Sequence, residues 1–264
     1  MSAPGTSPPK VVPPLHSVTS QQSAPANVII EVGPDGNKYY VQKAFLVHYS
    51  EYFSKALSGT WEEAKNGVVT LTDVLPGVFN LFVEWLYTQH LPSNYSQIAD
   101  GTTSNEQKWM LRLYVFADRF AVAALRTAMN RAMVKKFNKP SPAPYQSVIY
   151  AFDNLPSTDP LLDLLVDTAF VTWYSSRDST KSAAMIQDLP KDFFVRFYMR
   201  VGNERTQSRA NQFGAFDIDF CSYHEHENEA DKANCPNQYK LAAGKYKLER
   251  PDVNKEPKDT GSSS

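Results

Sequence analysis

The sequence predicts an α+β fold, in which a small sheet with a helical cluster is followed by an all-helical extension. Three short β-branched segments occur before residue 72, and beyond them apolar residues recur mostly at helical spacing. Strands and helices do not alternate along the chain, which argues against a parallel sheet built from βαβ units. With 42% hydrophobic residues among 264, the chain can bury a sizeable core.

The three strands are expected at residues 28–32, 39–41 and 68–71. The first is rich in Val and Ile and stops at a Gly-Pro-Asp-Gly sequence over residues 33–36. Two strands around such a turn predict a β-hairpin. The third strand, Val-Val-Thr-Leu, follows a helical stretch at residues 43–57.

The helix after the third strand has the clearest signals. Asp73 and Pro76 are helix-start residues, and four apolar residues follow at the i, i+3, i+4, i+7 spacing of a buried face. These residues are Phe79, Phe82, Val83 and Leu86. Further helices are expected at residues 109–120, 121–137, 145–152, 161–174 and 193–199.

Proline-rich stretches divide the chain. Residues 1–26 hold 6 of the 18 prolines and no acidic residue, which predicts a disordered arm. A cluster at Pro140, Pro142 and Pro144 predicts a boundary between helices. We therefore expect a first domain at 27–137, a helical extension at 145–205, a Cys/His-containing tail at 206–240 and a disordered tail at 241–264.

Composition argues against several classes of protein. The net charge of −1 is unlike that of a dedicated nucleic-acid binder, and no run of about 18 apolar residues predicts a membrane span. Two cysteines do not make a disulfide scaffold, and the first 26 residues lack the apolar block of a secretory signal. We expect a soluble protein of the cytoplasm, the nucleus or both. No P-loop, dinucleotide-binding Gly pattern or nucleophile elbow occurs, so we expect no catalytic or cofactor-binding residues and no enzyme.

The order and spacing of four segments resemble the BTB/POZ domain: residues 41–46, 49–53, 69–74 and 79–88. Residues 117–120 with Leu125 resemble its late helix pair. The resemblance covers about residues 27–137, and the sequence is similar to BTB proteins of the filamentous-fungal type. The later helices resemble a shortened BACK-like extension, and a similar Cys/His tail is typical of that fungal type.

The sequence departs from the family pattern at three places. Gln42 stands where a His is usual, Gln89 stands where a Gly is usual, and the loop at residues 92–107 is longer and more polar. Family members that recruit cullin scaffolds often have a hydrophobic-x-acidic motif in this loop. The loop contains no convincing copy, which argues against cullin binding.

The resemblance implies function by contact with other proteins and no catalytic centre. We expect a homodimer or hetero-association, with a scaffold or adaptor role. The alternative is a substrate adaptor of a cullin-type ubiquitin ligase, although no substrate-binding repeat is recognisable, and a transcriptional regulator is a third hypothesis. Candidate interface residues lie on the first helices, and for each of them ordinary core packing is the competing interpretation. They are Phe45, Leu46, Tyr49, Tyr52 and Phe53.

Both cysteines lie in one 15-residue window with two of the five histidines. Cys221, His224, His226 and Cys235 have the spacing Cys-x2-His-x-His-x8-Cys, and two thiolates with two imidazoles are a tetrahedral zinc set. Histidines two apart share one side of a strand but not of a helix. A helical segment would therefore leave Cys221, His224 and Cys235 with one outside ligand.

Two alternatives to a structural zinc ion are open in this window: a reversible disulfide, and no cross-link at all. Reducing conditions inside cells disfavour the disulfide. The acidic neighbours would raise local cation affinity, but they also suit a solvated helix. They are Glu225, Glu227, Glu229 and Asp231.

Overall fold

The computed structural model describes residues 27–103, 106–137, 143–172, 184–211, 218–226, 228–235 and 240–241. The arm expected at 1–26 and all but the first residue of the tail expected at 241–264 lie outside these ranges. Pro140 and Pro142 lie outside them too, while Pro144 is the residue that precedes helix α8 (Tyr145–Asn154).

The sheet has three strands in the order β2–β1–β3. Strands β1 (Asn27–Val32) and β2 (Asn37–Gln42) form the expected antiparallel hairpin, and β3 (Val68–Leu71) is parallel to β1. Gly33 and Gly36 adopt the positive φ angles, 80° and 63°, that the turn between the strands requires. The α+β prediction and its three strands are therefore confirmed.

Two short helices replace the single helix expected at residues 43–57. Helix α1 (Lys43–Tyr49) ends at Ser50, which starts helix α2 (Glu51–Ala56). The Ser50 hydroxyl accepts the Phe53 N–H at 3.1 Å and donates to the Phe120 carbonyl at 2.6 Å. A buried cap of this kind ends one helix and starts the next, and apolar periodicity does not reveal it.

The remaining helices of this unit are α3 (Glu62–Asn66), α4 (Pro76–Thr88), α5 (Tyr95–Asp100), α6 (Glu106–Arg119) and α7 (Ala123–Phe137). Helix α5 lies inside residues 92–107, for which the sequence predicted a loop. Its start is fixed by Asn94, whose side chain accepts the Gln97 N–H at 3.0 Å.

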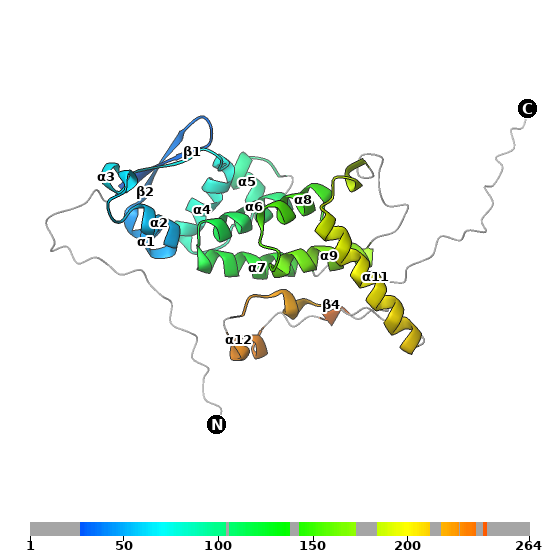
Figure 1. Cartoon of the computed structure of the whole chain (residues 1–264). Coiled ribbons are helices and arrows are strands. Elements are labelled where there is room, and N and C mark those ends of the chain that lie inside the picture. Colours follow the sequence, from blue (N-terminus) through cyan, green and yellow to red (C-terminus); the bar gives the residue numbers. More distant parts are fainter. Residues whose placement is uncertain are drawn as a thin grey trace, which may run out of the picture.

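The core of the first unit is built from phenylalanine rings of different helices. Phe116 lies 4.9 Å from Phe82 and 4.3 Å from Phe120, measured between ring centroids. Phe53 stacks on Phe120 at 5.7 Å. These rings join α2, α4 and α6, the helices drawn in blue, cyan and green in Figure 1.

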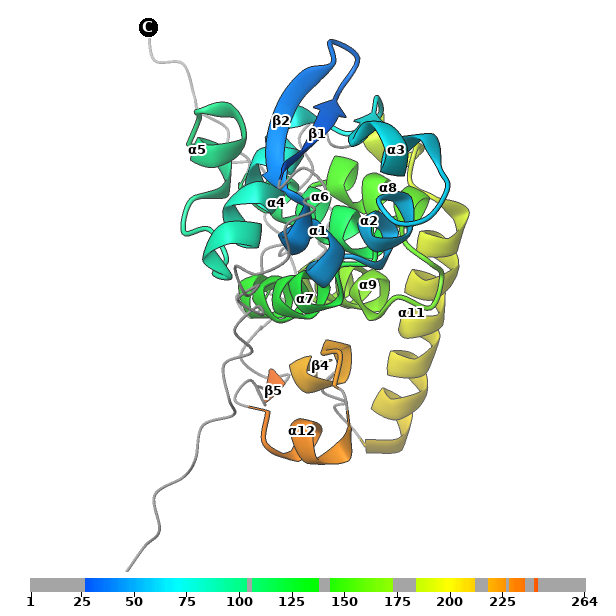
Figure 2. The same ribbon diagram turned by 90° about the vertical axis from the view of Figure 1, so that its left-hand side faces the viewer.

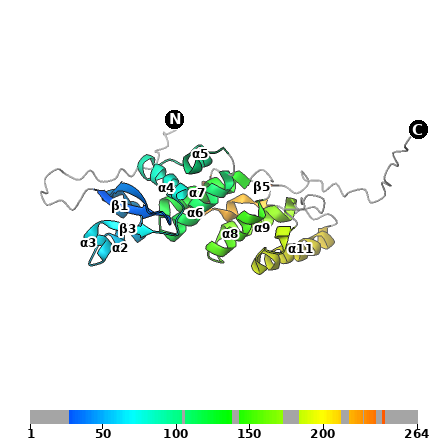
Figure 3. The same ribbon diagram turned by 90° about the horizontal axis from the view of Figure 1, so that it is seen from above.

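The extension consists of α8, α9 (Pro160–Thr172) and α11 (Lys191–Asn211). It lies at the opposite end of an elongated molecule from the sheet (Figure 3). Helix α11 runs past residue 205, so the boundary expected there falls inside a helix. Among the described residues, no helix is long and apolar enough to cross a membrane.

The chain then returns to α7 and α9 with short elements: β4 (Ile218–Asp219), the 3-10 helix η1 (Phe220–Tyr223), α12 (Glu229–Ala233) and β5 (Lys240–Leu241). Figure 2 shows this part in orange beneath α7 and α9. We refer to residues 218–235 as the C-terminal segment.

Candidate metal centre and association surface

The four residues of the Cys/His pattern converge on one point. Their ligand atoms all lie within 4.8 Å of one another, and the group could hold a metal ion. The Cys221 Sγ lies 3.3 Å from the His226 Nε2, and the Cys235 Sγ lies 3.2 Å from the His224 Nδ1. A zinc tetrahedron with ordinary Zn–S and Zn–N bonds has ligand-to-ligand edges of about 3.3–3.8 Å, so these spacings suit such an ion.

Local backbone geometry explains why both histidines can join. The 3-10 helix η1 ends at Tyr223, and His224 has extended φ and ψ angles of −79° and 144°. An extended backbone places alternate side chains on one side, which brings His224 and His226 together with 5.6 Å between ring centroids. The three-ligand alternative that a helix would have imposed is therefore not needed.

Helix α12 returns the chain to the cluster. The Asn228 side chain accepts the Asp231 N–H at 2.9 Å and so caps the start of this helix. A turn at its end, in which the Cys235 N–H donates to the Lys232 carbonyl at 3.2 Å, presents the second thiol. This cap and this turn bring Cys235 back to His226 across the eight residues that separate them in the sequence.

Cys221, His224 and Cys235 are buried, and burial favours the neutral forms of Cys221 and His224. Burial raises the pKa of the Cys221 thiol, and burial lowers the pKa of His224. Both cysteines are free thiols, so the structure contains no disulfide between them. A divalent cation would reverse this preference at the thiols, because a metal-bound thiol is deprotonated.

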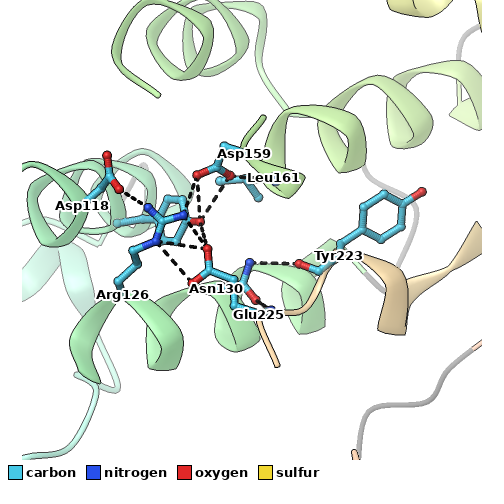
Figure 4. Close-up of polar contacts among 8 residues, drawn as sticks. Asp118, Arg126, Asn130, Asp159, Leu161, Tyr223 and Glu225 are labelled. Atoms are coloured by element: carbon cyan, nitrogen blue, oxygen red, sulfur yellow. Dashed lines mark hydrogen bonds and ion pairs between the residues drawn. The ribbon is translucent and has the colours of Figure 1, made fainter. Parts of the chain in front are cut away.

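Asn130 of α7 attaches the C-terminal segment to the first unit. Its Nδ2 donates to the Tyr223 carbonyl and its Oδ1 accepts the Glu225 N–H, each at 3.0 Å. Figure 4 shows this fork from Asn130 to Tyr223 and Glu225, with Glu225 directed toward Arg126. Asn130 is fully buried, and the fork satisfies both polar ends of its amide.

Arg126, also on α7, joins three parts of the chain through carboxylates (Figure 4). Its guanidinium pairs with Asp118 of α6 and with Glu225, and lies 3.0 Å from Asp159. The Asp159 carboxylate also accepts the Leu161 N–H at the start of α9. Burial raises the pKa of Asp159, and the Leu161 N–H, the Arg126 cation and the Tyr114 hydroxyl oppose this rise by favouring the ionised form.

A second polar group anchors Tyr223 on the other side. The Tyr223 hydroxyl donates to the Asp167 carboxylate of α9, which also accepts from Arg200 of α11. Tyr223 and Glu225 flank His224 in the chain, so contacts to α9 and α7 hold both neighbours of this ligand. Sequence reasoning did not predict Arg126, Asn130 or Asp167. The alternation of Tyr223 and Glu225 with the histidines was the one available signal.

The five predicted interface residues divide into two groups. Leu46 and Phe53 are fully buried in the core of this chain. Their side chains are therefore not available to a partner. Phe45 and Tyr49 are half-buried and Tyr52 is 39% exposed. For these three residues an interface role stays a prediction.

A groove lies where the first unit meets the extension. It is lined by residues of α4, α6 and α8 and has a volume of about 270 Å³. The Arg112 guanidinium lies in its wall, 5.4 Å from the centroid of Trp109 and 5.6 Å from that of Tyr150. This surface is concave and both polar and apolar, and its lining includes the charged residues Arg112, Arg119 and Asp73.

Comparison with known proteins assigns the first unit. Residues 18–136 match the family model of the BTB/POZ domain, and the three-stranded sheet with its helical cluster is consistent with that fold. BTB/POZ domains are in general protein–protein interaction modules.

One curated relative is a BTB and MATH domain-containing protein of Caenorhabditis elegans (protein 15 of that name), 36% identical over 88 residues. The matched residues are 33% of this chain and 29% of that protein. The chain therefore spans less than a third of the relative's length. The fungal type and the Cys/His tail of the expected resemblance stay predictions.

Proposed function

We propose that this protein is an interaction module that acts as a scaffold or adaptor through association of its BTB domain. The observation that best supports this proposal is an aromatic surface beside α1. Phe45 packs edge-on against Tyr87, with 5.2 Å between ring centroids, and Tyr87 is 45% exposed. Tyr49 lies one helical turn further along α1. Aromatic residues are enriched in protein interfaces, and large exposed apolar patches mark interaction sites.

Light scattering of the full chain at tens of micromolar tests this proposal, and we expect a homodimer. Phe45→Glu combined with Tyr87→Glu should give a monomer, because two charges cannot be buried unpaired in an apolar interface. Tyr198→Glu on α11 is the matched control, since Tyr198 is an exposed aromatic residue away from α1. A wild-type chain that stays monomeric at this concentration would contradict homodimerisation.

Hetero-association is the finer alternative, including a role as substrate adaptor of a cullin-type ubiquitin ligase. The groove between α4, α6 and α8 supports binding of an extended segment of a partner protein. A pull-down with cullin should distinguish the two roles. If cullin binds, Arg112→Glu should weaken the binding, because Arg112 lies in the wall of the groove. Absence of binding leaves the self-associating scaffold.

We further propose that the Cys/His cluster holds one structural zinc ion. Two thiols and two imidazole nitrogens that converge within 4.8 Å of one another support this assignment, and a structural role fits four protein ligands with no open position. Metal analysis of protein purified without chelator should find one equivalent per chain, and Cys221→Ser or Cys235→Ser should abolish it. A metal-free protein whose melting temperature is unchanged by chelator would contradict the proposal.

This proposal places the protein in the cytoplasm, the nucleus or both, where thiols stay reduced and can bind zinc. It includes no direct contact with nucleic acid or membrane. It also includes no catalytic step.

A further inference from the structure

His226 uses its two ring nitrogens for different contacts. The Nε2 faces the Cys221 thiol at 3.3 Å, and the Nδ1 lies 3.3 Å from the Asp231 carboxylate. A carboxylate that accepts the Nδ1 proton leaves the lone pair on Nε2, which is the nitrogen directed at the centre of the cluster. Histidine ligands of metals commonly have such a carboxylate behind them, where it fixes the ring orientation and raises ligand basicity.

Asp231 is in turn held by the BTB domain. Its two carboxylate oxygens lie 3.0 and 3.3 Å from the Nη2 of Arg131 on α7. The Arg131 side chain is 40% exposed, so this ion pair by itself contributes little to folding stability. Its consequence is positional, because it fixes the carboxylate that orients His226.

Charge balance supports the same arrangement. A zinc ion with two thiolates and two neutral imidazoles has no net charge, and the Arg131–Asp231 pair has none. Replacing Asp231 by a neutral residue would leave the Arg131 cation without its counter-charge beside this neutral site.

We propose that the BTB domain completes the metal site: Asp231, positioned by Arg131, orients His226, so that zinc binding and docking of the C-terminal segment on α7 are coupled. Asp231 and Arg131 are positioning residues that touch no metal. This inference rests on the proposed zinc ion. By linkage, residues of α7 that dock the segment raise zinc affinity, and bound zinc strengthens the docking by the same factor.

The test is zinc affinity of the full chain, measured by competition with a chelator of known affinity. Asp231→Asn should weaken zinc binding about 10- to 100-fold, the range for loss of an outer carboxylate partner. Glu229→Gln is the matched control on the same helix, because it removes the same charge from an exposed residue and should leave the affinity within about twofold.

The arginine provides an independent second variant. Arg131→Gln should weaken zinc binding as well, whereas Lys135→Gln should not, because Lys135 is exposed one turn further along α7. The thermal unfolding of the BTB domain should be the same in these variants, which separates loss of orientation from loss of folding. Asp231→Asn and Arg131→Gln proteins with wild-type zinc affinity would overturn the inference.

A failure of the zinc proposal has a different signature. If the wild-type chain binds no zinc, the structural ion and the coupling both fall. If the wild-type chain binds one equivalent and the Asp231 and Arg131 variants bind it equally well, only the coupling falls. The oligomeric state of the BTB domain is measured separately and depends on neither result.

Discussion

The BTB domain and the C-terminal segment are held in place by different forces. The BTB domain buries strands and helices around stacked phenylalanines, so its stability comes mainly from apolar area removed from water. Among its described residues, the C-terminal segment adds Phe220 and Tyr223 to that core. Its remaining attachments are directed polar contacts and the Cys/His cluster. A short segment cannot build a core of its own, and buried hydrogen bonds, ion pairs and the Cys/His cluster replace one.

The largest effect should follow from removing an aromatic ring of the BTB core. Phe82→Ala leaves a cavity between α2, α4 and α6, because Phe82 is fully buried against Phe53 and Phe116. We expect a loss of about 3–5 kcal/mol in the free energy of unfolding, measured by urea denaturation. A loss below about 1 kcal/mol would show that the core is not the main source of stability.

The next largest effect should come from the charge network that joins both regions. Arg126→Ala leaves the fully buried Asp159 without its cation. We expect a loss of about 3 kcal/mol in the free energy of unfolding, at the low end for a broken buried pair because Arg126 is partly exposed. A double-mutant cycle with Asp159→Asn should show coupling, since the asparagine no longer needs the cation. Additive effects in that cycle would contradict a direct interaction.

A medium effect is expected at the junction of α1 and α2. Ser50→Ala removes the N-cap of α2 and the hydrogen bond to the Phe120 carbonyl. The expected loss is about 1–2 kcal/mol in the free energy of unfolding. Ser58→Ala, at an exposed serine beyond α2, is the control and should have no measurable effect.

The buried carboxyls predict a pH dependence. Burial raises the pKa of Asp167 above its ordinary value of 3.8. The folded chain therefore binds this proton more tightly than the unfolded chain, and the contribution to stability is largest at low pH and is lost as pH rises through the folded-state pKa. Asp167→Asn should remove this part of the slope in a series of denaturation curves at acidic pH. An unchanged slope would place the effect in other carboxyls.

The smallest effect is expected at an exposed ion pair of the BTB domain. Arg119 lies 2.6 Å from Asp73, but both side chains are more than half exposed. Arg119→Ala should change the free energy of unfolding by less than about 1 kcal/mol. This variant is also the control for Arg126→Ala, because both remove an arginine from a carboxylate partner. Equal losses at the two sites would remove the distinction between buried and exposed pairs.

Local patterns were enough to predict much of the fold. The Gly-Pro-Asp-Gly turn gave the hairpin, and Pro76 with its apolar stripe gave α4. Ser50 and Asn94 were missed, because a serine or asparagine becomes a helix cap only when its side chain meets a particular backbone N–H. The two buried interface candidates, Leu46 and Phe53, show the same limit: an apolar helix residue does not reveal which side the core is on.

The Cys/His cluster was predictable because its four residues lie close in sequence and belong to few chemical types. The groups that support it were not. Glu225 and Arg126 are 99 residues apart, and Asp231 and Arg131 are 100 residues apart. Such pairs depend on how the C-terminal segment returns to α7, which no periodicity or spacing in one sequence specifies.

Hydrogen exchange of the full chain, with zinc and after chelation, tests most directly whether the C-terminal segment depends on the metal. We predict that chelation removes protection from residues 218–235 and leaves the strands and the core helices of the BTB domain protected. The stability of the C-terminal segment would then depend on zinc, while that of the BTB domain would depend on its apolar core. Equal protection of residues 218–235 with and without zinc would contradict the account.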